Sequence, residues 1–306
     1  MTPEELLAVE FELHRPRLRA VAYRMLGSLA EADDAVQEAW LRLSRNDSGE
    51  IANLAAWLTT VVGRVCLDLL RARTAHREQP LPEHLPDPVV GADDAGDPEH
   101  QALLADAVGL ALQVVLHSLA PAERLAFVLH DMFGLPFEQI GPLVDRTPGA
   151  AKKLASRARR RVRAAPHPGG DPAEHRRAVD AFRNAAAGGD FDALLAILDP
   201  DVLLRADTGA HPLQTVRGAA TVAGQATGFR RGGGAGATMR PVLINGLPGL
   251  AGVRDGRPIS LMSFTVAGGR IAGIDILADP DRLGRLDLPG FDDRPDPVTS
   301  AGPRSS

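Results

Sequence analysis

The sequence predicts a multidomain chain in which two all-α helical domains precede an α+β domain. Apolar residues recur at helical spacing through residues 1–76 and again through residues 106–166, which indicates amphipathic helices. An acidic, proline-rich stretch at 77–105 separates these two segments, and we expect a linker there. Between residues 172 and 290, two short helical patterns precede runs of aliphatic and β-branched residues bounded by glycines, which is typical of an α+β domain.

The elements of each domain follow from the local pattern. A second linker at 166–170 consists of Pro, His and Gly, and the final segment, 291–306, is rich in Pro and Ser and is expected to be a disordered tail. Helical spacing covers residues 18–26, 32–43 and 54–65 of the first domain. In the last domain we expect helices at 173–187 and 191–198 and strands at 202–206, 238–245, 259–266 and 271–277.

The composition excludes several classes of protein. The chain has 306 residues, a formal net charge of −5 and 1 cysteine, Cys66, which excludes an intramolecular disulfide and a multi-cysteine zinc site. The 9 histidines show no metal-ligand spacing, so we expect no cofactor. No apolar run approaches the roughly 18 residues of a membrane span, and there is no signal-peptide pattern, so we expect a cytoplasmic protein.

The basic residues are concentrated in one segment. Between Arg146 and Arg163 every charged residue is basic, although the chain as a whole is acidic, and this indicates a localised nucleic-acid contact. Thr147 is a favourable N-cap and Pro148 suits the first helical turn, so a helix is expected to begin here, after the short helix and tight turn of residues 137–146. A small apolar face and an opposite cationic face complete the pattern of a helix-turn-helix.

The cationic face is expected to contact DNA, because arginine can bind guanine edges bidentately and either cation can hold phosphates. The alternative is a solvated basic face on a C-terminal helix. The residues that we expect to contact DNA are Thr147, Lys152, Lys153, Ser156, Arg157 and Arg160.

The first domain contains an acidic helix. Residues 29–43 combine an apolar stripe with an acidic face that could dock on a basic partner helix, the alternative being a solvated acidic surface. We expect Trp40 and Trp57 to be core residues rather than platforms for stacking bases.

The next helix of the first domain is expected from about residue 53 to residue 73. Arg64, Asp68 and Arg71 lie roughly on one side of it. Either Arg64 and Asp68 form an i,i+4 ion pair, or Arg64 and Arg71 approach DNA. The loop 45–51 before this helix could hold an unstacked base.

Together these motifs resemble an extracytoplasmic-function (group IV) bacterial sigma factor. Residues 33–40, Asp-Asp-Ala-Val-Gln-Glu-Ala-Trp, are similar to the polymerase-binding helix of that family. Residues 57–71 resemble its −10 recognition helix, and residues 146–159 resemble its −35 recognition helix. The resemblance covers about the first 165 residues of the chain.

The remainder resembles a SnoaL-like domain of the NTF2-like cone fold, which a SigJ-like subgroup of these sigma factors carries. Three short signatures of the subgroup are degenerate here, at residues 80–84, 231–235 and 279–283. The Asp-Gly-Gly-Gly-Lys signature keeps neither of its original charges, since it reads Arg-Gly-Gly-Gly-Ala, with the acid replaced by a base and the lysine by alanine. The residues expected in an interdomain regulatory contact are Arg231, Gly232, Gly233, Gly234, Asp279, Pro280, Asp281, Arg282 and Leu283.

The resemblance implies that the chain binds core RNA polymerase, through its β′ and β subunits, and directs it to the −10 and −35 elements of promoter DNA. The fused domain is expected to modulate this activity, and its cone could hold an unidentified small ligand. The residues implied in binding the polymerase are Asp33, Asp34, Gln37 and Glu38, and those implied at the −10 element are Arg64, Asp68 and Arg71.

Two alternatives belong to other classes of protein. Relatives of the cone fold include enzymes that use a carboxylate or a histidine as acid or base, for which Asp207, His211 and Asp275 are the candidates here, although we expect no enzyme. A helix-turn-helix regulator with a ligand-binding or weakly enzymatic domain is the second alternative. The acidic helix distinguishes this second alternative from a sigma factor, because a sigma factor needs such a helix and a repressor does not.

Overall fold

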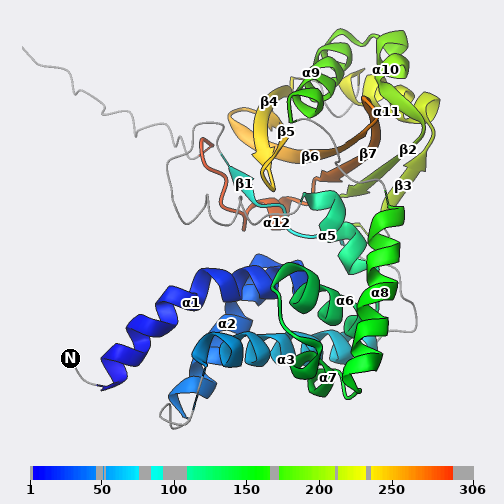
Figure 1. The fold of residues 1–306 in the computed structure, drawn as a ribbon. Helices are drawn as coiled ribbons and strands as arrows, with labels where there is room; N and C mark the ends of the chain where they lie inside the picture. The colour runs from blue at the N-terminus through cyan, green and yellow to red at the C-terminus, as the bar shows by residue number, and fades with distance from the viewer. Residues whose placement is uncertain are drawn as a thin grey trace, which may run out of the picture.

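The computed structural model describes residues 3–45, 51, 53–75, 84–91, 109–165, 172–210, 213–231 and 236–291. Helices fill one half of the molecule, and a curved sheet with helices on one side fills the other (Figure 1). This order, helical domains followed by an α+β domain, is the fold class that the sequence predicts.

The first helical domain consists of three helices that follow the predicted apolar patterns. Gly27 ends the first of them in the left-handed region, with φ 72°, and a Cβ at this position would overlap the ring of His117. Only glycine therefore fits both the turn and the packing. The three helices are α1 (Pro3–Leu26), α2 (Leu29–Ser44) and α3 (Leu54–Ala75).

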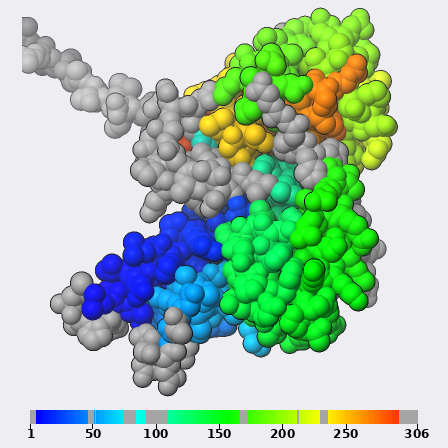
Figure 2. All heavy atoms as spheres, in the orientation of Figure 1, coloured from blue at the N-terminus to red at the C-terminus, as the bar shows by residue number. Residues whose placement is uncertain are grey.

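The second helical domain packs directly on the first, so that α1–α3 and α5–α8 share one hydrophobic core. Gly63 of α3 faces Leu125 and Leu129, and Figure 2 shows the two helical domains meeting without a gap on the visible face. The sequence predicted them as separate domains, since periodicity does not report which apolar faces meet. The elements are α5 (Leu110–His117), α6 (Pro121–Phe127), the π-helix η2 (Val128–Met132), α7 (Phe137–Leu143) and α8 (Pro148–Ala164).

The C-terminal domain is built on a seven-stranded sheet of order β1-β4-β5-β6-β7-β2-β3, in which only β2 and β7 run parallel. Its helices are α9 (Pro172–Gly188), α10 (Phe191–Ile197), α11 (Ala219–Arg231) and α12 (Pro280–Leu283). The strands are β1 (Val90–Gly91), β2 (Leu198–Asp207), β3 (Gln214–Arg217), β4 (Thr238–Ile244), β5 (Leu247–Arg254), β6 (Arg257–Ala267) and β7 (Arg270–Leu277).

The two faces of this sheet have different partners. Helices α9, α10 and α11 cover one face, with Phe182 and Phe264 in contact at 5.2 Å between ring centroids. The other face carries Leu261 and Leu277 and packs against α12 and against α5 of the second helical domain. The C-terminal domain is therefore joined to the helical domains through its sheet.

Part of the predicted linker is docked rather than free. Within 77–105, residues 84–91 pack on both the C-terminal domain and the helical domains: Leu85, Val89 and Val90 are buried, Val89 lies in the helical core, and β1 extends the sheet at the edge of β4. Apolar side chains and an open sheet edge explain the docking, although proline and acidic residues dominate the segment. Residues 84–91 therefore belong to the packed structure, whereas the sequence predicted a linker throughout 77–105.

Strands β3 and β5 and helices α11 and α12 were not predicted from the sequence. Strand β5 contains Gly249 and Gly252, which read as loop residues. A Cβ at Gly249 would lie 2.8 Å from both Ile244 Cδ1 and the Met262 carbonyl oxygen, so a close strand approach requires glycine there. Glycines also lower the helical signal of α11.

Several predictions lie outside the described residues: the remaining linker residues, the loop at 46–50, Gly232–Gly234, His211 and the tail from 292. Cys66 is a buried core residue, as expected, and burial raises the pKa of its thiol to about 12. In the described ranges, no helix combines the length and apolar character of a membrane span.

Candidate DNA-binding and polymerase-binding sites

The helix-turn-helix consists of α7 and α8. The Thr147 hydroxyl accepts a hydrogen bond from a first-turn amide of α8 at 3.3 Å, and Pro148 follows it, so the predicted N-cap is confirmed. The turn requires glycine at position 141, because a Cβ there would lie 2.8 Å from the Arg146 carbonyl oxygen. Helix α7 has 7 residues and contains Pro142, in agreement with a short first helix.

The cations of α8 fall into two groups. Arg159 Nε donates to Asp131 Oδ1 of η2 at 2.8 Å, and Arg161 donates to Glu123 Oε2 of α6 at 3.0 Å. These two arginines hold α8 against its own domain. The face of α8 opposite its buried alanines is exposed. It carries Thr147, Lys152, Lys153, Ser156, Arg157 and Arg160.

The acidic face of α2 is at the surface. Asp34 and Gln37 are exposed, whereas both carboxylate oxygens of Asp33 accept hydrogen bonds from Arg19, at 2.6 and 3.0 Å. Glu38 is half-buried and accepts from Arg42 at 3.0 Å. All four predicted residues therefore lie at the surface of one helix, and two of them already have intramolecular partners.

Helix α3 brings its predicted DNA-contacting residues close to the helix-turn-helix. Arg64 and Asp68 are exposed, and in the described part of the chain no ion pair joins them. Arg71 donates to Asp145 Oδ2 at 3.1 Å, in the turn before α8. The same helix places Trp57 against the shared core, as expected of a core residue.

Two polar residues of the second helical domain bind the C-terminal end of α1. Gln113 donates to the Tyr23 carbonyl at 2.7 Å, and Arg124 donates to the Met25 carbonyl at 2.5 Å. The Tyr23 carbonyl also accepts from the Gly27 amide at 2.8 Å, so Gln113 is its second donor, and both side chains bind the last turn of α1. Burial lowers the pKa of Arg124 to about 10. Burial lowers the pKa of the neighbouring His117. The positive charges of nearby guanidinium groups, above all that of Arg124, lower it further.

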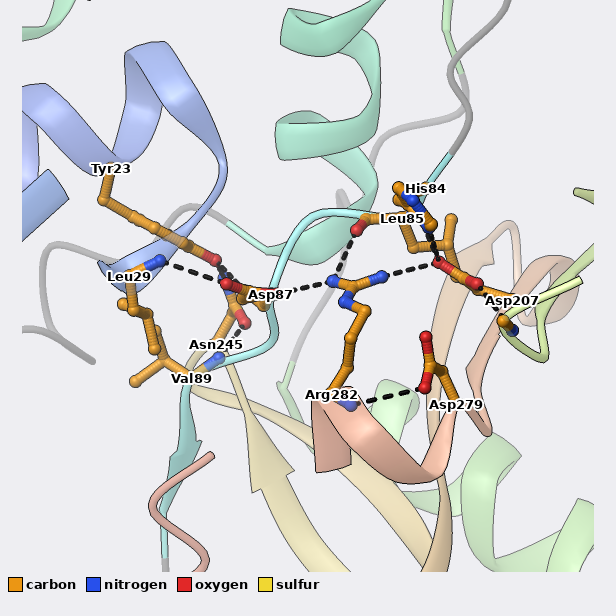
Figure 3. A network of polar contacts seen from close by, with 11 residues as sticks. Tyr23, Leu29, His84, Leu85, Asp87, Val89, Asp207, Asn245, Asp279 and Arg282 are labelled. Carbon is orange, nitrogen blue, oxygen red and sulfur yellow. Dashed lines mark hydrogen bonds and ion pairs between the residues drawn. The ribbon is translucent and has the colours of Figure 1, made fainter. Parts of the chain in front are cut away.

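The region around Arg282 joins the linker to the C-terminal domain (Figure 3). Arg282 donates to the Leu85 carbonyl at 2.7 Å, to Asp87 Oδ1 at 2.5 Å and to Asp207 Oδ2 at 2.5 Å. Asp279 caps α12 by accepting from the amides of the next turn, which fixes the start of the helix that carries Arg282. The predicted segment 279–283 thus includes the residue that makes the contact.

A second part of this network reaches the first helical domain. The Tyr23 hydroxyl donates to the Asp87 carbonyl at 2.5 Å and accepts from Asn245 Nδ2 at 3.1 Å. Asn245 Oδ1 in turn accepts from the Val89 amide at 2.9 Å. Burial raises the pKa of Tyr23, which keeps the hydroxyl protonated as a donor. No local pattern marks Tyr23 as a contact residue, and Asn245, which precedes a glycine, indicates only a turn.

Two of the acid and base candidates of the enzyme alternative, Asp207 and Asp275, lie in the described part of the chain, and neither is directed into the cone. Residues alternate across a strand, and Leu204, Ala206, Ile274 and Ile276 face the helices, so the nominated carboxylates face the other side of the sheet. Asp275 is buried against Arg205, whose Nε donates to it at 2.6 Å; burial raises the pKa of Asp275, and Arg205 opposes that effect. Asp207 binds Arg282 and the Leu85 amide.

These features define a class of protein: one that reads duplex DNA through a helix-turn-helix and presents a separate acidic helix to a partner. Two family models match the chain, Sigma-70 region 2 over residues 11–76 and Sigma-70, region 4 over residues 109–162. The chain belongs to the ECF RNA polymerase sigma factors, which are alternative sigma factors that direct transcription.

Individual relatives extend the similarity over nearly the whole chain. The ECF RNA polymerase sigma factor SigJ of Mycobacterium tuberculosis is 40% identical over 289 residues, which are 90% of this chain and 92% of SigJ. The probable ECF RNA polymerase sigma factor SigI of the same species is 31% identical over 293 residues, 94% of this chain and 98% of SigI. The crystal structure of SigJ covers 92% of this chain and 99% of its own, with a TM-score of 0.74 and 36% identity. The predicted fold class, helical domains followed by an α+β domain, is thereby confirmed.

Proposed function

We propose that this sigma factor binds core RNA polymerase through α2 and promoter DNA through α3 and α8, and that its C-terminal domain modulates activity by holding a closed form. The shared core of the two helical domains carries the proposal. In that core α3 packs against α6 and α7, and the Arg71–Asp145 ion pair joins the two predicted DNA-reading regions.

The closed form is too short for a promoter. The −10 and −35 elements lie about 25 base pairs apart, which is about 85 Å of B-DNA at 3.4 Å per step. With 22 and 17 residues, α3 and α8 are about 33 and 26 Å long at 1.5 Å per residue. Even end to end they would not span the distance, and in the closed form Arg71 and Asp145 are 3.1 Å apart. Binding both elements therefore requires the two helical domains to separate.

The surface of α2 suits a basic helical partner such as the coiled coil of the polymerase β′ subunit. Asp34 and Gln37 are exposed, and Leu41, 37% exposed, follows at helical spacing on the same face. The Asp33–Arg19 and Glu38–Arg42 ion pairs are near the surface, where such pairs contribute about 0–1 kcal/mol, so exchanging them for a partner's cations costs little. Because core RNA polymerase acts in the cytoplasm, the proposed function implies a cytoplasmic protein.

The DNA contacts divide between two helices. The exposed cations of α8 would bind the −35 duplex, with Arg157 and Arg160 available to base edges and phosphates. Arg64, Asp68 and Arg71 of α3 would contact the −10 element, once Arg71 has left Asp145.

A structural role for the C-terminal domain is supported over a catalytic one. Asp207 and Asp275, the candidate acid and base residues in the described part of the chain, are engaged by Arg282 and Arg205. The side of the sheet under α9–α11 is filled by apolar side chains that include Phe182, and a small ligand there stays a prediction.

Run-off transcription with core RNA polymerase and the full-length protein tests the proposal. Arg282→Ala should increase promoter-specific transcript, because it removes three contacts that hold the closed form. Arg285→Ala is the matched control, since Arg285 is exposed one turn further along. Equal transcript from the two variants would contradict regulation through this contact. Asp34→Arg should abolish binding to core polymerase, and unchanged binding would contradict the role of α2.

A further inference from the structure

Asp87 was not among the predicted site residues, yet its backbone and carboxylate groups bind α1, the start of α2 and α12 (Figure 3). Its amide donates to the Gly27 carbonyl at 2.7 Å, and its carbonyl accepts from the Tyr23 hydroxyl at 2.5 Å. Its carboxylate accepts from the Leu29 amide at 3.1 Å through Oδ2 and from Arg282 at 2.5 Å through Oδ1. One linker residue therefore connects the α1–α2 turn with α12 of the C-terminal domain.

Helix α2 has no local side-chain cap. Ser28 occupies the N-cap position with an extended backbone, φ −118° and ψ 131°, but its hydroxyl makes no capping hydrogen bond. The first amides of a helix lack intrahelical acceptors, and the helix N-terminus favours a negative charge. Asp87 supplies both an acceptor and a charge, from 58 residues further along the chain.

We infer that Asp87 is a positioning residue for the polymerase contact, which caps α2 and, through Arg282, couples this helix to the C-terminal domain. The inference rests on the proposed function, in which α2 binds the polymerase. The two oxygens of one carboxylate serve the two domains separately.

The cap acts on the residues that would meet the polymerase. Asp33 and Asp34 follow the first turn of α2, which begins at Leu29. Without the Asp87 carboxylate this turn would fray more often, and the acidic face would be ordered for a smaller fraction of the time. Loss of an N-cap corresponds to about a fivefold change in an equilibrium constant, which is the largest effect expected on polymerase binding.

Titration of core polymerase into full-length protein labelled at its N-terminus tests the inference. Asp87→Ala should weaken binding by about fivefold. Asp87→Asn should bind as the unmodified protein does, because asparagine is an equally good cap, although it loses the ion pair with Arg282. Ser28→Asp introduced into the Asp87→Ala variant should restore the affinity. Both Asp87 variants should lose thermal stability, so a merely structural role would lower both affinities together.

The outcomes separate the inference from the proposed function. Unweakened binding by Asp87→Ala, equal weakening by Asp87→Asn, or no rescue by Ser28→Asp would each overturn it. If the unmodified protein does not bind polymerase, the proposed function fails. Amide hydrogen exchange of the Leu29 turn in the free protein then tests whether Asp87 caps α2. Exchange there should be faster in Asp87→Ala than in Asp87→Asn, and equal rates would overturn the inference.

Discussion

Replacing Gly63 by leucine should open the closed form, because Gly63 is a point of close contact between α3 and the second helical domain. A Cβ at this position would lie 3.2 Å from Leu129 Cδ1 and 3.3 Å from Leu125 Cδ1. A methyl group fits if these flexible side chains shift slightly. An isobutyl group does not fit, and it would force α3 away from α6 and η2.

The size of the effect follows from overpacking. Extra methylenes in a packed core cost about 1–3 kcal/mol. Leucine is a better helix former than glycine by about 0.8 kcal/mol, so α3 itself is not weakened. The cost therefore falls on the contact between the helical domains, and it corresponds to a shift of about 5- to 150-fold from the closed towards the open form.

Small-angle X-ray scattering and run-off transcription measure this shift. Gly63→Leu should increase the radius of gyration and the promoter-specific transcript, while circular dichroism shows unchanged helical content. Gly63→Ala is the control and should stay compact. A Gly63→Leu protein as compact as the unmodified one, with the same transcript yield, would refute the reasoning that these domains separate at α3.

Other variants address single surfaces. Leu41→Ala should weaken core polymerase binding several-fold in a pull-down titration without lowering the melting temperature, because the side chain is 37% exposed. Arg157→Ala should weaken the salt dependence of promoter binding, so that the slope of log K against log salt concentration becomes shallower by about one unit. Arg159→Ala should leave that slope unchanged and lower thermal stability, because Arg159 is bound to Asp131. Since the pKa of His117 is lowered in the fold, the unfolded chain takes up the proton first on acidification, so stability is lost as the pH falls below the ordinary histidine value. Denaturant unfolding should show a loss of about 1 kcal/mol between pH 7 and pH 5.5, and His117→Gln should remove this part of the pH dependence.

The predictions that succeeded rest on local patterns. Thr147 and Pro148 fixed the start of α8, and the alternation of small apolar and cationic residues decided which face is exposed. Such signals depend on residues within one or two turns of each other. What the pattern could not decide is which cations serve the fold, because Arg159 finds its partner, Asp131, 28 residues earlier in the chain.

The candidate carboxylates of the enzyme alternative show a different limit. Asp207 and Asp275 were chosen because they are ionisable residues in a domain that resembles a family containing enzymes. Whether a residue faces the cone interior depends on strand register, and a shift of one residue reverses it. The pairing of Arg205 with Asp275 across β2 and β7 places both on the face directed towards α5.

By itself, the sequence determined the helices of the two helical domains, the helix-turn-helix and the acidic face of α2, because caps and amphipathic spacing act over a few residues. Only the tertiary structure decided that the two helical domains share a core, that linker residues complete the sheet, and that Asp87 and Arg282 join three parts of the chain. These contacts link residues as distant as Tyr23 and Asn245, 222 positions apart. Their partners are chosen by the assembled surfaces, and no local pattern records them.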